Sequence, residues 1–256
     1  MYLKRKIDAV LESWYAGKRR PLILNGSRQV GKTASVRRFA TKRYENIVEI
    51  NFVQEPKYRS ILDDGYGAQE IVNAISRIDS GKRFAAGKTI IFFDEIQRFP
   101  DITTSLKFFV EDGRFDVICS GSLLGVHYSE IESNSVGYKT DVDMTGLDFE
   151  EFLWAKGYGD DLTDELLSDM VAHRPISQVT LEVVRRLFLD YCALGGMPDV
   201  VRSYIEQNGS FSGIYEKQAQ LVKDYRGDVR KYVAGLDQTR ILNVFDHIPV
   251  QLAKVK

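Results

Sequence analysis

An eight-residue segment near the N-terminus restricts the possible folds of this chain more than any other feature. Gly26 to Thr33 reads Gly-Ser-Arg-Gln-Val-Gly-Lys-Thr, which fits the pattern G-x-x-x-x-G-K-[ST]. The apolar run Pro21 to Asn25 before it predicts a strand, and the stretch Thr33 to Tyr44 predicts a helix. A loop of this pattern between a strand and a helix is typical of phosphate binding, so we interpret it as a P-loop. A plain glycine-rich turn is the alternative.

The residue types of this loop suit a nucleoside triphosphate. Glycines let successive backbone N–H groups turn toward an anion, and the helix N-terminus adds partial positive charge. We expect Lys32 to reach the β and γ phosphates and Thr33 to place its hydroxyl on Mg²⁺. The residues expected to contact ATP are Gly26, Ser27, Arg28, Gln29, Val30, Gly31, Lys32, Thr33 and Ala34.

A second motif ends the apolar stretch Thr89 to Asp94. Glu95 follows this stretch at once, so two carboxylates stand at the end of a predicted strand, as a Walker B segment requires. We expect Asp94 to hold the Mg²⁺ shell and Glu95 to orient an attacking water or take its proton. A pair of solvated acids is the alternative. The long interval after Lys32 leaves room for a further strand, Ile47 to Phe52, which favours the additional-strand class of P-loop proteins.

A fourth apolar run, Asp116 to Ser120, ends in small hydroxyl residues. A polar side chain at this strand end is placed to hydrogen-bond a terminal phosphate or the attacking water. We assign this role to Ser122 in preference to Ser120, and count Ser122 with Glu95 and Lys32 among the catalytic candidates. A Ser-Gly turn that merely leaves the strand is the alternative.

The order of the predicted elements indicates an α/β fold followed by helices. From Pro21 to about Leu147, short strands alternate with helical stretches, which is typical of a parallel sheet with crossover helices. From Asp148 onward helical spacing dominates, and Asp148 with Glu151 suits a helix cap. We predict a P-loop domain over residues 1–147 and a mostly helical domain over residues 148–256. The other predicted elements are a fifth strand, Thr140 to Thr145, and helices over Leu181 to Leu194, Pro198 to Gly209 and Tyr215 to Val233.

The composition is that of an ordinary globular protein. Of 256 residues, 44% are hydrophobic and 28% charged, and the net charge of −1 gives no general attraction to nucleic acid. No stretch approaches the ~20 apolar residues that cross a bilayer, and the N-terminus lacks the apolar core of a signal peptide. We therefore expect a cytoplasmic protein without membrane contact. Cys119 and Cys192 lie in apolar stretches without metal-ligand spacing, and we expect both to be buried.

Together these motifs resemble one known group, the predicted prokaryotic ATPases in which an AAA-type domain precedes an uncharacterised C-terminal domain of nuclease-like ancestry. The resemblance runs through nearly the whole chain in order. Beyond the P-loop with Arg28 and Gln29, it rests on Asn51-Phe52, Phe93 to Gln97, Ser105 to Lys107, Gly121 to Val126, Leu147 to Leu153, Gly195 to Pro198 and Ile248 to Ala253.

The resemblance implies a five-stranded, mainly parallel sheet of strand order 5-1-4-3-2, a helical part that acts as a lid, and ATP as the nucleotide. Two departures stand out. Members usually carry Pro-Val-Gly followed directly by a basic residue, whereas here the segment from Ser135 through Val136 and Gly137 continues with Tyr138 before Lys139. Members also run on well past the block that ends at Ala253, so we expect this chain to be an isolated module or a truncated piece.

Three functions are compatible with these motifs. The first is Mg²⁺-dependent hydrolysis of ATP to ADP and phosphate, with turnover moving the helical lid or a partner. The second is a nucleotide-gated switch that binds ATP tightly and signals through DNA or protein contacts with little turnover. The third, transfer of phosphate to a small molecule, lacks a recognisable acceptor pocket, and Glu95 suits the activation of water. A homo-oligomer and an unidentified DNA or protein partner remain open at this point.

Overall fold

The structure is a computed structural model that describes residues 1–122, 135, 137–232 and 236–252. Contacts divide the chain into two compact units, Met1–Arg202 and Ser203–Lys256. The predicted boundary between residues 147 and 148 stays a prediction. The part of the Gly121 motif from Leu123 to Val126, together with Val136 and Ala253, lies outside the described residues.

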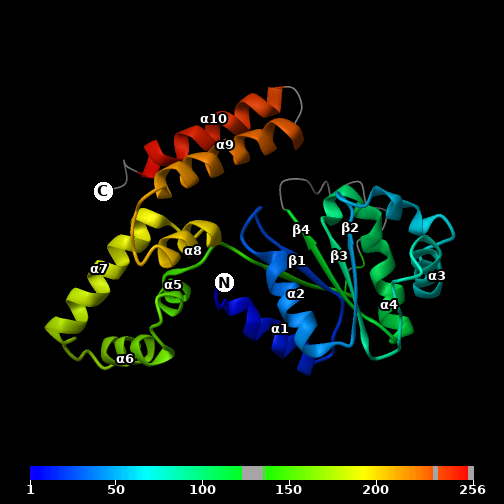
Figure 1. The fold of residues 1–256 in the computed structure, drawn as a ribbon, viewed down its shortest axis with the longest axis horizontal. Coiled ribbons are helices and arrows are strands. Elements are labelled where there is room, and N and C mark those ends of the chain that lie inside the picture. Colours follow the sequence, from blue (N-terminus) through cyan, green and yellow to red (C-terminus); the bar gives the residue numbers. More distant parts are fainter. Residues whose placement is uncertain (123–134, 136, 233–235, 253–256) are drawn as a thin grey trace. The chain divides into compact units, whose positions relative to one another are not determined.

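The first unit is built on a sheet of five strands (Figure 1). All four strand pairs are parallel, and the order across the sheet is β2-β3-β4-β1-β5. Counted from the opposite edge this is 5-1-4-3-2, the order that the resemblance implies. The strands are β1 (Leu22–Asn25), β2 (Asn46–Asn51), β3 (Thr89–Asp94), β4 (Asp116–Gly121) and β5 (Thr140–Asp143). Each predicted strand is present, with bounds that differ by no more than two residues.

Helices cover both faces of this sheet, which is why its central strands are apolar without alternation. On β3, Ile91 and Phe93 face a core shared with α3 (Ala68–Ile78) and α4 (Leu106–Asp112). The alternate residues Ile90 and Phe92 face a second core. That second core includes side chains from α1 (Lys6–Ala16) and α2 (Lys32–Arg43). Side chains that alternate along one strand thus pack into two separate cores, one on each face of the sheet.

The parallel register brings the polar ends of the strands to one edge of the sheet. Asn51 at the end of β2 is paired with Asp94 at the end of β3, and Asp94 is paired with Ser120 of β4. Asn25, the last residue of β1, is paired with Gly121. The loops that leave these strands therefore meet at one edge, where open α/β sheets bind ligands.

The remainder of the first unit is helical. Short 3₁₀ segments, η1 (Pro56–Leu62), η2 (Ile96–Arg98) and η3 (Pro100–Ser105), follow β2 and β3, and α5 (Phe149–Ala155), α6 (Asp160–Val171) and α7 (Gln178–Leu194) follow β5. The predicted cap of α5 is confirmed, because Asp148 accepts a hydrogen bond from the backbone N–H of Glu151 at 2.9 Å. Helix α7 ends before Gly195 as predicted, but begins three residues earlier than expected, behind the N-cap Ser177.

One expectation about the cysteines is wrong. Cys119 is buried in β4, but Cys192 on α7 is exposed. Only Leu187 and Leu194 are buried along α7, so most of that helix, including the turn with Cys192, faces solvent. An apolar stretch predicts a helix here but does not say which side of it is covered.

The second unit contains two long helices that pack against each other. These are α9 (Ile214–Tyr232) and α10 (Leu236–Leu252), joined across their surface by an ion pair of 2.6 Å between Arg226 and Asp246. Helix α8 (Pro198–Glu206) begins in the first unit and ends in the second, starting at Pro198 as predicted. Among the described helices, none combines the length and the apolar character needed to span a bilayer.

Candidate functional site

The loop between β1 and α2 has a backbone that depends on glycine at both ends. A Cβ on Gly26 would lie 2.1 Å from the carbonyl oxygen of Met144, so the close approach of these two segments excludes any side chain. Gly31 has φ of 100° and stands at the N-terminus of α2, where the left-handed conformation favours glycine. The segment therefore has the strand, loop and helix order that its pattern predicts.

Lys32, the first residue of α2, folds back over this loop. Its Nζ donates hydrogen bonds to the carbonyl oxygens of Gly26 at 2.9 Å and Ser27 at 2.8 Å. Burial lowers the pKa of Lys32, and the nearby carboxylates of Glu95 and Asp94 oppose that shift. The ammonium group of Lys32 therefore lies against the P-loop backbone and near the carboxylates of Asp94 and Glu95.

Asp94 is the centre of a network of hydrogen bonds at the sheet edge. Its Oδ2 accepts from Thr33 Oγ1 at 3.1 Å and from Asn51 Nδ2 at 3.0 Å. Its Oδ1 accepts from Ser120 Oγ and from the backbone N–H of Glu95. Burial raises the pKa of Asp94, while the hydrogen bonds from Ser120 and Thr33 counteract part of the rise. The two predicted metal residues thus touch each other although they lie far apart in sequence.

The donor set around Asp94 suits a hard cation. Thr33 supplies a hydroxyl oxygen and Asp94 a carboxylate oxygen, and Mg²⁺ binds through one or two such ligands together with substrate phosphates and water. The contacts of Asn51 and Ser120 to Asp94 were not predicted from the sequence. Each of these two residues lies at or next to the end of a strand beside β3, and that position becomes informative only once the strand order is known.

Glu95 follows β3 in a left-handed backbone conformation, with φ of 59° and ψ of 43°. Its Oε2 accepts a hydrogen bond from Nε2 of Gln97, a residue of η2. Ser122, the residue after β4, donates its backbone N–H to Oε1 of the same Gln97 at 3.2 Å. The Ser122 hydroxyl is buried and has no hydrogen-bond partner among the described residues. Lys32 and Glu95 line a cavity at this edge, whereas Ser122 does not line it and is linked to Glu95 through Gln97. The role of Gln97 is a further contact that the sequence did not predict.

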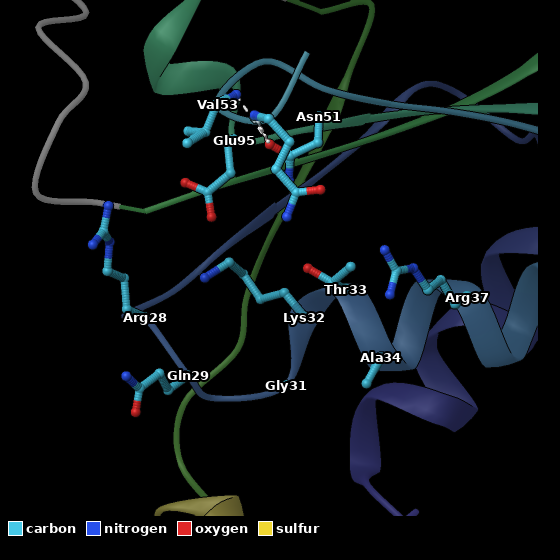
Figure 2. A pocket seen from close by; sticks show the side chains of 11 residues that line it. Arg28, Gln29, Gly31, Lys32, Thr33, Ala34, Arg37, Asn51, Val53 and Glu95 are labelled. Carbon is cyan, nitrogen blue, oxygen red and sulfur yellow. Dashed lines mark hydrogen bonds between the residues drawn. The ribbon is translucent and has the colours of Figure 1, made fainter. Parts of the chain in front are cut away.

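Of the residues described above, Gly31, Lys32, Thr33, Asn51 and Glu95 line this cavity of about 540 Å³. Figure 2 shows the side chains of Arg28, Lys32 and Glu95 pointing into a common space. Six of the nine residues predicted to contact nucleotide line the cavity, namely Arg28, Gln29, Gly31, Lys32, Thr33 and Ala34. Gly26 and Ser27 instead hold Lys32 through their carbonyl groups, and the side chain of Val30 is buried in the core.

Arg5 anchors the far side of the loop. Its guanidinium donates to the carbonyl oxygens of Val30 at 2.8 Å and Thr145 at 2.7 Å. Its Nε lies 3.0 Å from Oε1 of Glu151, and both side chains are 5% exposed. Sequence reasoning did not find this buried ion pair, because nothing in the local pattern connects Arg5 with residues about 140 positions away.

A parallel sheet of order 5-1-4-3-2 with this loop and a Walker B strand at its carboxyl edge defines the class of P-loop nucleoside triphosphatases. The family model of the AAA domain matches residues 18–153, just over half of the chain. The chain therefore belongs to the AAA domain family.

Two solved structures are similar to this chain at low sequence identity. The Walker-type ATPase paby2304 of Pyrococcus abyssi is 14% identical at a TM-score of 0.47, over 97% of this chain and 77% of that one. The Drosophila ORC bound to DNA is 15% identical at a TM-score of 0.43, over 90% of this chain and 67% of that one. Among curated proteins, none matches the sequence.

Proposed function

We propose that this protein binds ATP with Mg²⁺ and hydrolyses it to ADP and phosphate. The observation that carries the proposal is that Lys32 and Glu95 line one cavity, beside a direct contact between Thr33 and Asp94. Phosphoryl transfer depends mainly on positioning and on stabilising charge, and these residues supply both.

Each residue has a distinct part in this proposal. Lys32 neutralises charge on the β and γ phosphates, and the backbone N–H groups at the start of α2 bind phosphate oxygens. Thr33 and Asp94 hold the Mg²⁺ shell, and Mg²⁺ when bound neutralises phosphate oxygen charge. Glu95 orients the attacking water and accepts its proton. The unpartnered hydroxyl of Ser122 is a donor for the terminal phosphate or the water, and its burial without a partner supports this role.

In the proposed mechanism, the helical part that follows β5 acts as a lid. The turn between α7 and α8 is fastened to the segment after β5, because Leu147 donates its backbone N–H to Gly196 at 2.6 Å and Tyr191 donates its hydroxyl to Leu147 at 2.9 Å. Pro198, which starts α8, lies close to Gly31 of the P-loop. A change at the loop can therefore pass to α8, and from there to an unidentified protein or DNA partner or to another copy of the chain.

The test compares the wild type with Glu95→Gln for binding of ATP and GTP and for phosphate release with Mg²⁺. We expect the wild type to release phosphate from ATP, and Glu95→Gln to bind ATP while losing turnover by about 10²–10⁴-fold, the usual contribution of a general base. Normal hydrolysis by Glu95→Gln would exclude Glu95 as the base. Tight ATP binding without phosphate release in both proteins would favour the nucleotide-gated switch.

A further inference from the structure

The buried side chain of Gln97 contacts two separate parts of the site. Its Nε2 donates to the carboxylate of Glu95, and its Oε1 accepts from the backbone N–H of Ser122 at 3.2 Å. Gln97 is 8% exposed, so solvent competes little for either hydrogen bond. Because Gln97 belongs to η2 and Ser122 follows β4, this one amide connects the Walker B glutamate to the end of the neighbouring strand.

Only one orientation of the Gln97 amide satisfies both contacts. A backbone N–H can only donate and an ionised carboxylate can only accept, so the amide oxygen faces Ser122 and the amide nitrogen faces Glu95. The fit is close, since a Cβ on Gly121 would lie 3.3 Å from Gln97 Oε1 and 3.1 Å from Ile96 Cγ1. A shift of the end of β4 would therefore move the amide and, through it, the Glu95 carboxylate.

Three other polar side chains at this edge donate hydrogen bonds to Asp94, whereas Gln97 donates to the Glu95 carboxylate. The side-chain NH₂ of Asn51 and the hydroxyl groups of Thr33 and Ser120 all donate to Asp94. Glu95 has a left-handed backbone conformation, which is unfavourable for a residue with a side chain and is found where the surroundings hold it in place. Its backbone N–H donates to Asp94 at 3.0 Å, while its side chain lines the cavity. Within the described residues, the hydrogen bond that fixes the carboxylate itself comes from Gln97.

We propose that Gln97 is a positioning residue for ATP hydrolysis. It holds one oxygen of the Glu95 carboxylate, leaves the other for the attacking water, and makes the position of that carboxylate depend on the end of β4. The proposal rests on the proposed function of Glu95. Gln97 then affects the rate through Glu95 and contributes nothing to nucleotide affinity.

The first experiment replaces the amide with an apolar group of similar length, Gln97→Met. We expect kcat to fall by about 10- to 100-fold, as for a misplaced catalytic group, with KM and ATP affinity within about twofold of wild type. Gln178→Met is the matched control, because Gln178 donates to Glu182 at 3.1 Å on the exposed surface of α7, and its kcat should be unchanged. A kcat for Gln97→Met equal to that of the control would overturn the proposal.

A double-mutant cycle tests whether Gln97 acts through Glu95. In a Glu95→Gln background, Gln97→Met should cause no further loss of kcat, because the group that it positions is already gone. A full independent loss in that background would show a merely structural role. Normal turnover by Glu95→Gln alone would instead refute the proposed function, and that result is visible without any Gln97 variant.

A spectroscopic measurement tests the contact without turnover. In ¹⁵N-labelled protein, Glu95→Ala should shift the side-chain amide resonances of Gln97, whereas Glu182→Ala should leave them in place. Unshifted Gln97 resonances in Glu95→Ala would overturn the proposal. If Gln97→Met fails to fold, Gln97→Glu keeps an acceptor for Ser122 and removes the donor to ionised Glu95, and the same fall in kcat is expected.

Discussion

Lys32 shows how opposing forces act on a single side chain of this site. Burial favours the neutral amine and lowers the pKa of Lys32, whereas Glu95 and Asp94 favour the charged form. The two loop carbonyls that accept its hydrogen bonds stabilise the ammonium further. Phosphate oxygens would be stronger acceptors than these carbonyls, so the affinity of the loop for an anion should depend on this one side chain.

A ligand-induced shift in thermal stability measures that dependence. At about 100 times its Kd, MgATP should stabilise the wild type by about 2.7 kcal/mol and raise Tm accordingly. Lys32→Ala should abolish this rise, because the cation that meets the phosphates is removed. Lys42→Ala, a change on the exposed part of the same helix, should keep it. An equal rise in Tm for Lys32→Ala and wild type would contradict the assignment of the loop.

Gly26 gives a prediction about stability at the same scale. In Gly26→Ala the new Cβ would overlap the carbonyl of Met144, so the backbone must move, and we expect a loss of about 1–3 kcal/mol in the free energy of unfolding. Gly227→Ala in α9 has no neighbouring atom within 4 Å and should instead stabilise by about 0.5–1 kcal/mol. Urea denaturation of the two variants checks both signs.

At the scale of elements, the sequence predicts the strands and the P-loop, because each depends on a short stretch of residues. It does not predict contacts between residues that lie far apart in the sequence. The strands ending at Asn25 and Asp94 are continuous apolar runs, because helices cover both of their faces, and the P-loop between β1 and α2 follows from its fixed spacing. The contacts of Gln97 and Arg5 depend on strand order and on a distant helix. Neither leaves a periodic trace in the sequence, so only the structure could show them.

The cap of α5 yields a test that includes pH. Partial burial raises the pKa of Asp148, but hydrogen bonds from Lys6 and the Glu151 backbone, with the charges of Lys6 and Arg5, outweigh it and leave the pKa below its usual value. A lowered carboxyl pKa stabilises the fold above the unfolded pKa of about 3.9 and loses that effect as pH falls through the folded pKa.

Asp148→Ala removes this cap. At pH 7 we expect a loss of about 1 kcal/mol in the free energy of unfolding, within the range for N-cap residues. The difference from wild type should shrink as the pH falls below 4, because protonated Asp148 no longer stabilises the helix. Urea denaturation at pH 7 and at pH 3 checks this, and a difference that is the same at both values would contradict it.

At the scale of the whole first unit, Arg5 joins segments that are remote in sequence. Its contacts link the N-terminus, the P-loop at Val30, the end of β5 at Thr145 and helix α5 at Glu151. Because both charges of the pair with Glu151 are buried, the loss of Glu151 leaves Arg5 without a counter-charge, with only its two carbonyl contacts. The P-loop is therefore held in place by residues that precede β1 and by residues that follow β5.

Glu151→Ala tests this arrangement. We expect a loss of about 3–5 kcal/mol in the free energy of unfolding, the usual effect of leaving one buried charge unpaired. Glu150→Ala, at a partly exposed position paired with Lys6, should cost less than about 1 kcal/mol. If both variants unfold at the same urea concentration, the ion pair of Arg5 and Glu151 contributes nothing special to stability.

The position of β1 in the sheet has a consequence for the protein while it is being made. β1 comes first among the strands of this sheet in chain order and lies between β4 and β5, so both of its neighbours are synthesised after it. At about 5–20 residues per second, the interval between Asn25 and Asp116 takes roughly five to twenty seconds of translation. During that time the apolar residues Leu22 to Leu24 have no strand beside them. We therefore expect the nascent chain to need protection from aggregation around β1 until β4 and β5 have been made, before the nucleotide site can form.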